Sequence, residues 1–490
     1  MKNIFNFSTA FFVFLALPCV FAFSENKAVN NILQIPPAEE IFVIKNQDGS
    51  DFTEENLDGN QIIKFSMYFG LLDETSQEFG NALSAYDNLK NYCVSSGIAE
   101  LGEEERGEAI LTAMYSNVLS QYSLKQTKVD VALNSGVYNC VSSALLYLAL
   151  ASDLGLDARV QETSRHAFIT LYLSDGRKID VETTNPYGFN PGTKKSVSPD
   201  SKKYAVVPRN YYSNRKEISK RRAVTLVAKN ICADLNEKDD YASASPLAAA
   251  AYSFVTAEKD DARNDFDTVA GNFVVYADKK HLSEAGLDFL DEVFLRYGKS
   301  EYLLKQYNDV AYNSAAFNCN QNNFDLAENN FEKRRDNLTR KNADEIKKMI
   351  FESRTFYDSQ NLGADDGIKY VQNARKSQFA LSDQNFARNL EKVEESFWSA
   401  KIVPVFNSGD FLAAASICDE GLLSLPKSSY LKNTRNACLQ NHAAEIHNKI
   451  VPLVNSKKYD EASAVLNEAL KSNPESQRLK NDLKMVQSAK

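Results

Sequence analysis

The sequence is poor in the residues that mark several common protein classes. It has four His and seven Cys among 490 residues, with no C-x-x-C pair and no H-E-x-x-H motif. This excludes the usual patterns of structural zinc, zinc proteases and thioredoxin-type enzymes. With 19 Gly, 12 Pro and 43% hydrophobic residues, the chain is neither a disordered polymer nor a fibrous repeat. Its net charge of −9 gives no overall attraction to a phosphate backbone, so we expect no nucleic-acid partner.

Long apolar runs are also lacking, since none reaches the ~18 residues that a membrane span needs. Residues 1–24 instead resemble a signal peptide, with an apolar stretch from Phe11 to Leu17 and a small-residue cleavage site around Ala22. We therefore expect an exported protein, periplasmic or extracellular. Cys19 is an alternative, lipoprotein-type processing site, disfavoured because Pro18 precedes it, and only lipidation there would make a membrane a partner.

The length predicts more than one domain. Residues 25–60 contain turn-forming Asp-Gly pairs and predict a loosely attached N-terminal segment. Helical and strand patterns alternate over 61–235, and the pattern over 236–490 is helical almost throughout.

Internal repeats occupy the helical part. Lys401-Ile402-Val403-Pro404 recurs 48 residues later as Lys449-Ile450-Val451-Pro452. A large residue followed three positions later by Ala also recurs at Tyr241, Leu282 and Phe324. Small Ala residues let helices approach closely, so the pattern indicates stacked helical hairpins. It resembles tetratricopeptide repeats (TPR) with a longer step, which implies a helical array that binds a protein partner.

One stretch, residues 134–192, differs from the rest. Cys140 begins a run, Val141 to Leu150, that is apolar on nearly all sides and ends near Gly155, which predicts a buried helix. In the first turn of that helix, unpaired N–H groups and the helix dipole favour a thiolate over a thiol. The alternative is that Cys140 is only a small core residue.

His166 begins a predicted strand that leads, through the turn Ser174-Asp175-Gly176, into a second strand. The apolar side chains of both strands share one face only if directly opposed residues have numbers that add to an even number, which needs a turn of odd length or a bulge. The same register puts His166, Asp180 and Glu182 together on the other face. The alternative is a structural, hydrogen-bonded His.

A thiol, an imidazole and a carboxylate in this order are the groups of a cysteine nucleophile with its base and orienting acid. Cys140, His166-Ala167-Phe168 and Asp180-Val181-Glu182-Thr183 resemble the motifs of the transglutaminase-like superfamily. The resemblance implies a papain-like α+β fold and acyl transfer through a thioester, with Cys140 as nucleophile, His166 as base and then acid, and Asp180 as orienter. Glu182 is the alternative orienter, and no cofactor or metal is implied.

Two positions depart from the family pattern. Tyr138 stands where Gly is common, and Phe168 where Trp often follows His-Ala, and both lie where the acyl donor would bind. The Cys140 backbone N–H is the natural first donor to an oxyanion. Candidates for the second donor are Tyr138, Asn139 and Gln126.

Two neighbouring features have functional and structural interpretations. The turn-rich loop 185–192 could wall the acceptor side of the site or serve as a rigid connector. Residues 194–229 contain eleven Lys or Arg and two acids, which favours either an anionic partner or pairing with acids of the same chain.

The expected fold class is therefore an α+β papain/transglutaminase-like domain followed by an all-α, TPR-like helical-hairpin solenoid. The expected function is that of an exported cysteine enzyme acting on a peptide or amide carbonyl. Hydrolysis is favoured over transfer to an amine, because water is the acceptor unless the site excludes it. The alternative is a non-catalytic scaffold that uses its repeats. A metal site at Cys140 and His166, with Asp180 and Glu182 contributing, is disfavoured because no further Cys or His ligand lies nearby.

Overall fold

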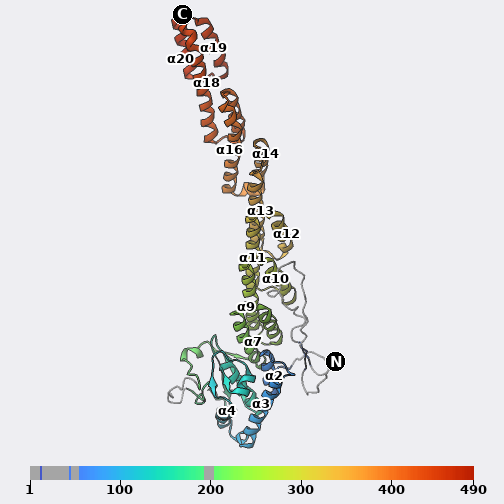
Figure 1. Cartoon of the computed structure of the whole chain (residues 1–490). Helices are drawn as coiled ribbons and strands as arrows, with labels where there is room; N and C mark the ends of the chain where they lie inside the picture. The colour runs from blue at the N-terminus through green and yellow to red at the C-terminus, as the bar shows by residue number, and fades with distance from the viewer. Residues whose placement is uncertain (1–10, 14–42, 46–53, 192–202) are drawn as a thin grey trace. The chain divides into compact units, whose positions relative to one another are not determined.

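The computed structural model describes residues 11–13, 43–45, 54–191 and 203–490 (Figure 1). The chain divides into two compact units, residues 1–311 and 312–490. The boundary falls inside a helix, α11 (Glu301–Asn320), whereas the sequence pattern changes near residue 236. The helices between residues 236 and 311 therefore belong to the same unit as the strands.

Unit 1 combines helices with a small set of strands. In chain order they are α2 (Gly59–Phe69), α3 (Gln77–Ser95), the 3-10 turn η2 (Ile98–Glu100), α4 (Glu103–Asn117), α5 (Val129–Ser135), α6 (Cys140–Asp153), η3 (Arg209–Tyr212), α7 (Lys220–Asn236), α8 (Tyr241–Phe254), α9 (Lys259–Lys279), α10 (Ser283–Tyr297) and the first part of α11.

The largest sheet has four short strands in the order β7-β6-β5-β8, all antiparallel. Its strands are β5 (Asp157–Glu162), β6 (Ala167–Tyr172), β7 (Lys178–Val181) and β8 (Lys216–Ile218). Two pairs of very short strands complete the set: β1 (Phe11–Val13) with β2 (Val43–Lys45), antiparallel, and β3 (Gln121–Tyr122) with β4 (Val137–Tyr138), parallel.

Helix α6 is the buried helix that the sequence predicts. Its residues Val141–Ala151 are all buried, and it packs against α2 and against strands β5 and β6. The Asn139 side chain caps its first turn, in a capping box with Ser142. Because the cap fixes where the helix begins, it also fixes Cys140 in the first turn.

The hairpin of β6 and β7 has the predicted even register, with Ile169 opposite Val181 and Thr170 opposite Asp180. The turn is closed by Leu173 N donating to Arg177 O at 2.9 Å, and Gly176 adopts a positive φ of 87°. Three residues therefore form the turn, which is the odd length that apolar alternation requires.

The expected fold class is wrong. The molecule is 71% helical, and its sheets are small. In the described residues of the 61–235 segment, strands cover only two residues each in β3 and β4, short runs over 157–181, and 216–218, which supplies too little strand for an α+β domain. Much of the segment with alternating helix and strand patterns forms α2 to α5 instead. Helices α2, α4 and α5 pack against α6, and α3 packs against α2, α4 and α5, so each helix buries one face.

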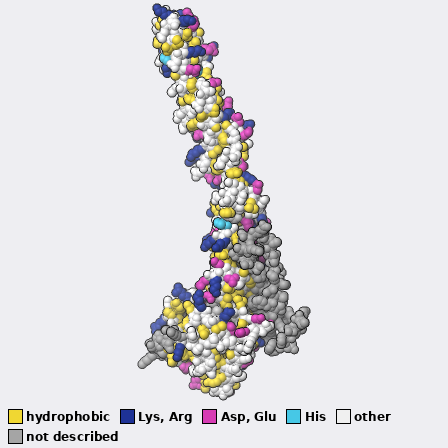
Figure 2. All heavy atoms as spheres, viewed as in Figure 1, with side chains coloured by type: hydrophobic (Ala, Val, Ile, Leu, Met, Phe, Trp, Pro, Cys, Tyr) yellow, Lys and Arg dark blue, Asp and Glu magenta, His cyan; other side chains and the backbone are white. Residues whose placement is uncertain are grey.

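Unit 2 consists of helices: the end of α11, α12 (Phe324–Arg334), the 3-10 turn η4 (Arg335–Asn337), α13 (Arg340–Ser359), α14 (Ala364–Ala374), α15 (Gln378–Ser382), α16 (Gln384–Asn407), α17 (Phe411–Ser424), α18 (Ser429–Asn455), α19 (Tyr459–Ser472) and α20 (Gln477–Ala489). On the face shown in Figure 2, acidic and basic side chains are mixed along these helices.

The predicted duplication is confirmed within unit 2. Helix α19 begins and ends 48 residues after α17, and the small residues Ala414 and Ala462 are both fully buried. The helical pairs are consistent with TPR-like repeats.

The predicted signal peptide and Cys19 lie outside the described residues, apart from the strand Phe11–Val13. Across the part of the chain that the structure describes, no helix combines the length and the apolar character needed to cross a bilayer.

Candidate active site

Cys140 is the first residue of α6 and is only partly buried, whereas the other five free cysteines of the described chain are buried. The Asn139 carbonyl of the cap side chain accepts from the backbone N–H groups of Val141 and Ser142 at 2.9 and 3.1 Å. The Cys140 N–H stays outside this cap. The sulfur thus lies at the positive end of a helix dipole, where negative charge is stabilised.

His166 directly precedes β6 and brings its imidazole between two acidic groups. Its Nε2 lies 2.7 Å from Glu182 Oε2, and both side chains are about 5% exposed or less. The ring also hydrogen-bonds with the Cys140 side chain. Because Glu182 occupies Nε2, Nδ1 is the ring nitrogen left for the sulfur.

The charges around the imidazole favour its protonated form. Burial alone would lower the pKa of His166, but the hydrogen bonds and negative charges of Cys140 and Glu182 outweigh it and raise the pKa to about 10. Burial would likewise raise the pKa of Glu182, yet His166, Tyr212 and Thr184 hold it below its usual value. The arrangement therefore favours an ion pair between the His166 imidazolium and the Glu182 carboxylate.

Asp180, the predicted orienter, does not contact the imidazole. It accepts from Thr170 Oγ1 at 2.7 Å and pairs with Arg215 at 2.6 Å. The reason is the register: Thr170 lies opposite Asp180, four residues along β6 from His166. Continuing the pairing by one step on the same face places Glu182 beside Phe168, next to the imidazole. Glu182, the alternative orienter, therefore replaces Asp180 in the site.

Glu182 is held by groups that sequence reasoning misses. Its carboxylate accepts from Tyr212 Oη at 2.5 Å, and from the Thr184 backbone N–H and hydroxyl at 3.0 and 2.7 Å. Tyr212 comes from η3, 30 residues downstream, and no motif marks it. Four donors, counting His166, thus fix the carboxylate.

The loop after β7 supports the Glu182 backbone. Glu182 N donates to Gly188 O at 2.9 Å, and a Cβ at position 188 would lie 1.9 Å from Glu182 O. Only Gly allows this approach. The described part of the predicted cleft wall therefore serves to hold β7 and its carboxylate.

Two of the three candidates for a second oxyanion donor are engaged elsewhere. The Asn139 side chain caps α6 and donates to Leu124 O at 3.1 Å. The Tyr138 ring is fully buried, and its hydroxyl bonds with Tyr115 Oη and donates to Lys203 O, both at 2.9 Å.

Gln126 and Tyr122 lie beside the start of α6. Ser142 Oγ, in the first turn, donates to Gln126 O at 3.2 Å. Strand β3 pairs Tyr122 with Tyr138, two residues before the thiol, and burial and the Cys140 charge raise the pKa of the Tyr122 hydroxyl. Tyr122 is thus a further candidate for the second oxyanion donor. The sequence could not predict it, because a strand of two residues leaves no recognisable pattern.

The basic segment is largely paired within its own chain. Arg222 is buried, and its guanidinium bonds with Glu162 and Asp265 at 3.2 and 2.6 Å; Lys229 reaches the same two carboxylates. These contacts favour the structural interpretation of the described part of the segment.

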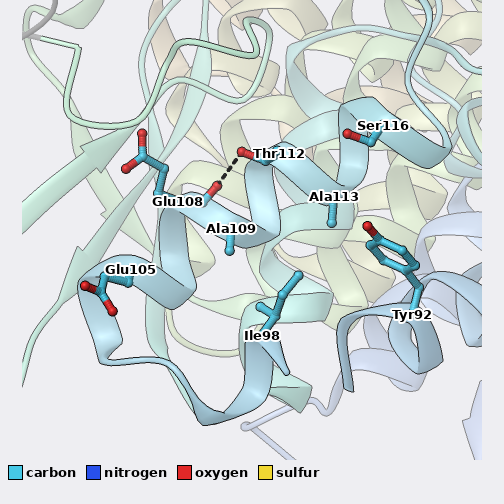
Figure 3. A pocket seen from close by; sticks show the side chains of 8 residues that line it. All are labelled: Tyr92, Ile98, Glu105, Glu108, Ala109, Thr112, Ala113 and Ser116. Carbon is cyan, nitrogen blue, oxygen red and sulfur yellow. Dashed lines mark hydrogen bonds between the residues drawn. The ribbon is translucent and has the colours of Figure 1, made fainter. Parts of the chain in front are cut away.

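A hollow of about 320 Å³ lies elsewhere, between the end of α3, η2 and α4 (Figure 3). Glu105, Glu108 and Tyr92 are among its lining residues, and Cys140, His166 and Glu182 are not. Within the described ranges, no group of three or more His, Cys, Asp or Glu side chains is arranged to hold a metal.

Comparisons with known proteins add little. No family model matches the chain, and no curated protein matches it. Among solved structures it is similar to menin, in a crystal structure said to reveal the binding site for Mixed Lineage Leukemia (MLL) protein, with 10% identity over 70% of this chain and 88% of that chain and a TM-score of 0.27. A likeness at that TM-score bears on neither fold nor function.

Proposed function

We propose that the protein is a thiol enzyme that transfers an acyl group from a peptide, amide or ester carbonyl through a thioester on Cys140. The observation that carries the proposal is the buried Glu182–His166 pair aimed at a partly exposed thiol in the first turn of a helix. The order of the motifs, as in the transglutaminase-like superfamily, supports the same chemistry.

In this mechanism the Cys140 thiolate attacks the carbonyl carbon, and the His166 imidazolium gives its proton to the leaving nitrogen or oxygen. The acyl group remains on the sulfur as a thioester. Water then attacks the thioester while neutral His166 takes its proton, which releases the acid and restores the Cys140 thiolate and the His166 imidazolium. Glu182 keeps Nδ1 directed at the sulfur and stabilises the imidazolium.

The Cys140 N–H and the Tyr122 hydroxyl supply the oxyanion donors in this proposal. Tyr122 is favoured because burial raises the pKa of its hydroxyl and the negative charges of Cys140 and Glu182, which both act on it, raise that pKa further. Hydrolysis stays the favoured outcome over transfer to an amine, and export and a protein partner on the repeats stay predictions.

Alkylation with iodoacetamide separates the enzyme from a non-catalytic scaffold. We expect Cys140 to be labelled at neutral pH faster than a free cysteine peptide, and His166→Ala to remove that advantage. Labelling of Cys140 that is slow in the wild type and unchanged in His166→Ala supports the scaffold. Asp180→Asn is the matched control. It removes a carboxylate of β7, close in sequence to Glu182, that pairs with Arg215 and does not contact the imidazole.

A further inference from the structure

Two cysteine thiols meet in unit 2, far along the sequence from the candidate active site. Cys418 lies in α17 and Cys438 in α18. Both side chains are fully buried in one hydrophobic cluster, together with Trp398 and Leu431. Both are free thiols in this structure.

The packing of α17 on α18 places the two thiols opposite each other. Gly421 approaches Leu431 so closely that a Cβ there would lie 2.9 Å from Leu431 Cδ1. Asp419 pairs with Arg435 at 2.5 Å. The two helices are therefore antiparallel: residues earlier in α17 contact residues later in α18. The next position in this series brings Cys418 to Cys438. The two thiols also hydrogen-bond with each other.

The duplicated module shows what these positions hold when no sulfur is present. At the offset of 48 residues that relates α17 to α19, Cys418 corresponds to Leu466 and Cys438 to Val486. Both are fully buried in one cluster of their own. Ordinary apolar side chains therefore satisfy the packing, and packing alone does not require two facing thiols.

We propose that Cys418 and Cys438 form a disulfide that cross-links α17 to α18 when the chain folds in contact with a disulfide oxidant. The thiolate of one cysteine attacks the oxidant disulfide and releases one reduced thiol. The second cysteine attacks the mixed disulfide and releases the other thiol, so the protein loses two electrons and two protons and the oxidant gains them.

Burial, followed by the neighbouring Cys438 thiol, raises the pKa of Cys418 to about 12. Little thiolate is therefore present in the folded hairpin at neutral pH. The disulfide should accordingly form fastest while α17 and α18 are still folding against each other.

The test refolds the full chain, in a Cys140→Ser background, in a mixture of oxidised and reduced glutathione. Free thiols are then alkylated under denaturing conditions and the digest is analysed by mass spectrometry. We expect the Cys418 and Cys438 peptides to be recovered joined and lacking two hydrogen atoms. Recovery of both as alkylated peptides, or in bridges to other cysteines, overturns the proposal.

The sister module supplies the matched control. Cys418→Leu with Cys438→Val reproduces the pair found at Leu466 and Val486 and cannot cross-link. Reduction should lower the melting temperature of the oxidised parent by roughly 5–10 °C, and should leave the double variant unchanged. Equal melting temperatures of the parent with and without reductant also contradict the proposal.

Discussion

Cys140 at the start of α6 and Cys418 within α17 are both helical cysteines, but they differ in position and in surroundings. Cys140 is partly exposed in a capped first turn and shares hydrogen bonds with an imidazole that a buried carboxylate holds. Cys418 is fully buried in the middle of its helix, among apolar side chains and one further thiol. The difference teaches that the groups that hydrogen-bond to the sulfur, and the groups that hold them in place, decide whether a cysteine is a nucleophile or a core residue.

The largest expected effect comes from replacing each of the two cysteines in turn. Cys140→Ala should lower acyl transfer by about 10³-fold or more, because no other group can form the thioester. Cys418→Ala should leave the rate within about twofold and lower the free energy of unfolding by about 1 kcal/mol. Steady-state kinetics with an activated ester and urea unfolding measure the two effects. The comparison fails if Cys418→Ala abolishes the activity of folded protein.

The pH dependence of alkylation gives the next largest effect. His166, with its pKa raised to about 10, stays protonated from pH 6 to 9 and favours the Cys140 thiolate throughout. At pH 6.5 an ordinary thiol of pKa ~8.5 is only about 1% ionised, whereas Cys140 keeps the His166 imidazolium beside its sulfur, so Cys140 should be alkylated faster than a free cysteine peptide, by up to about 100-fold.

That advantage should shrink as the pH rises toward about 10, because the reference thiol ionises and His166 then loses its proton. In His166→Ala, the rate of Cys140 should instead rise with pH in parallel with the reference. A wild-type ratio that is independent of pH contradicts the ion pair.

Glu182 and Asp180 are two carboxylates at the end of one strand, and only one contacts the imidazole. Glu182→Gln should lower acyl transfer about 10- to 100-fold, since it removes a charge-assisted hydrogen bond of about 1.5–3 kcal/mol. Asp180→Asn should change the rate less than about twofold. Equal losses in the two variants, at equal stability, contradict the assignment of Glu182 as orienter.

The smallest effect tests the oxyanion donor. Tyr122→Phe should lower acyl transfer about 10-fold, through the loss of one hydrogen bond to the developing charge. Alkylation of Cys140 should be unchanged, because displacement of iodide forms no oxyanion. If Tyr122→Phe slows both reactions alike, Tyr122 acts on the thiol instead.

Much of the site follows from local sequence. The apolar run after Cys140 predicts α6, and the alternation on both sides of Ser174-Asp175-Gly176 predicts the hairpin and its register. That register already implies Glu182, since a three-residue turn around Asp175 leaves Asp180 four residues from His166 along the strand. The family order of motifs pointed to Asp180 and outweighed the geometry.

Other features could not be predicted from the sequence, because their partners are distant along the chain. Tyr212 reaches Glu182 from a 3-10 turn, and Tyr122 reaches the site from a strand of two residues. The fold class failed for a related reason, because short strand-like patterns do not reveal that surrounding helices will dominate the packing. In unit 2, by contrast, the copied segment could be read directly, since its contacts lie between neighbouring helices.

The central claim is that Cys140 forms a covalent acyl intermediate. Its most direct test is the intact mass of the protein after brief exposure to an activated acyl ester, followed by peptide mapping and treatment with neutral hydroxylamine, which cleaves thioesters. The account predicts one added acyl group on Cys140 that hydroxylamine removes, and much slower acylation in His166→Ala. Wild-type protein that gains no acyl group, or gains it on lysines in a form resistant to hydroxylamine, would contradict it.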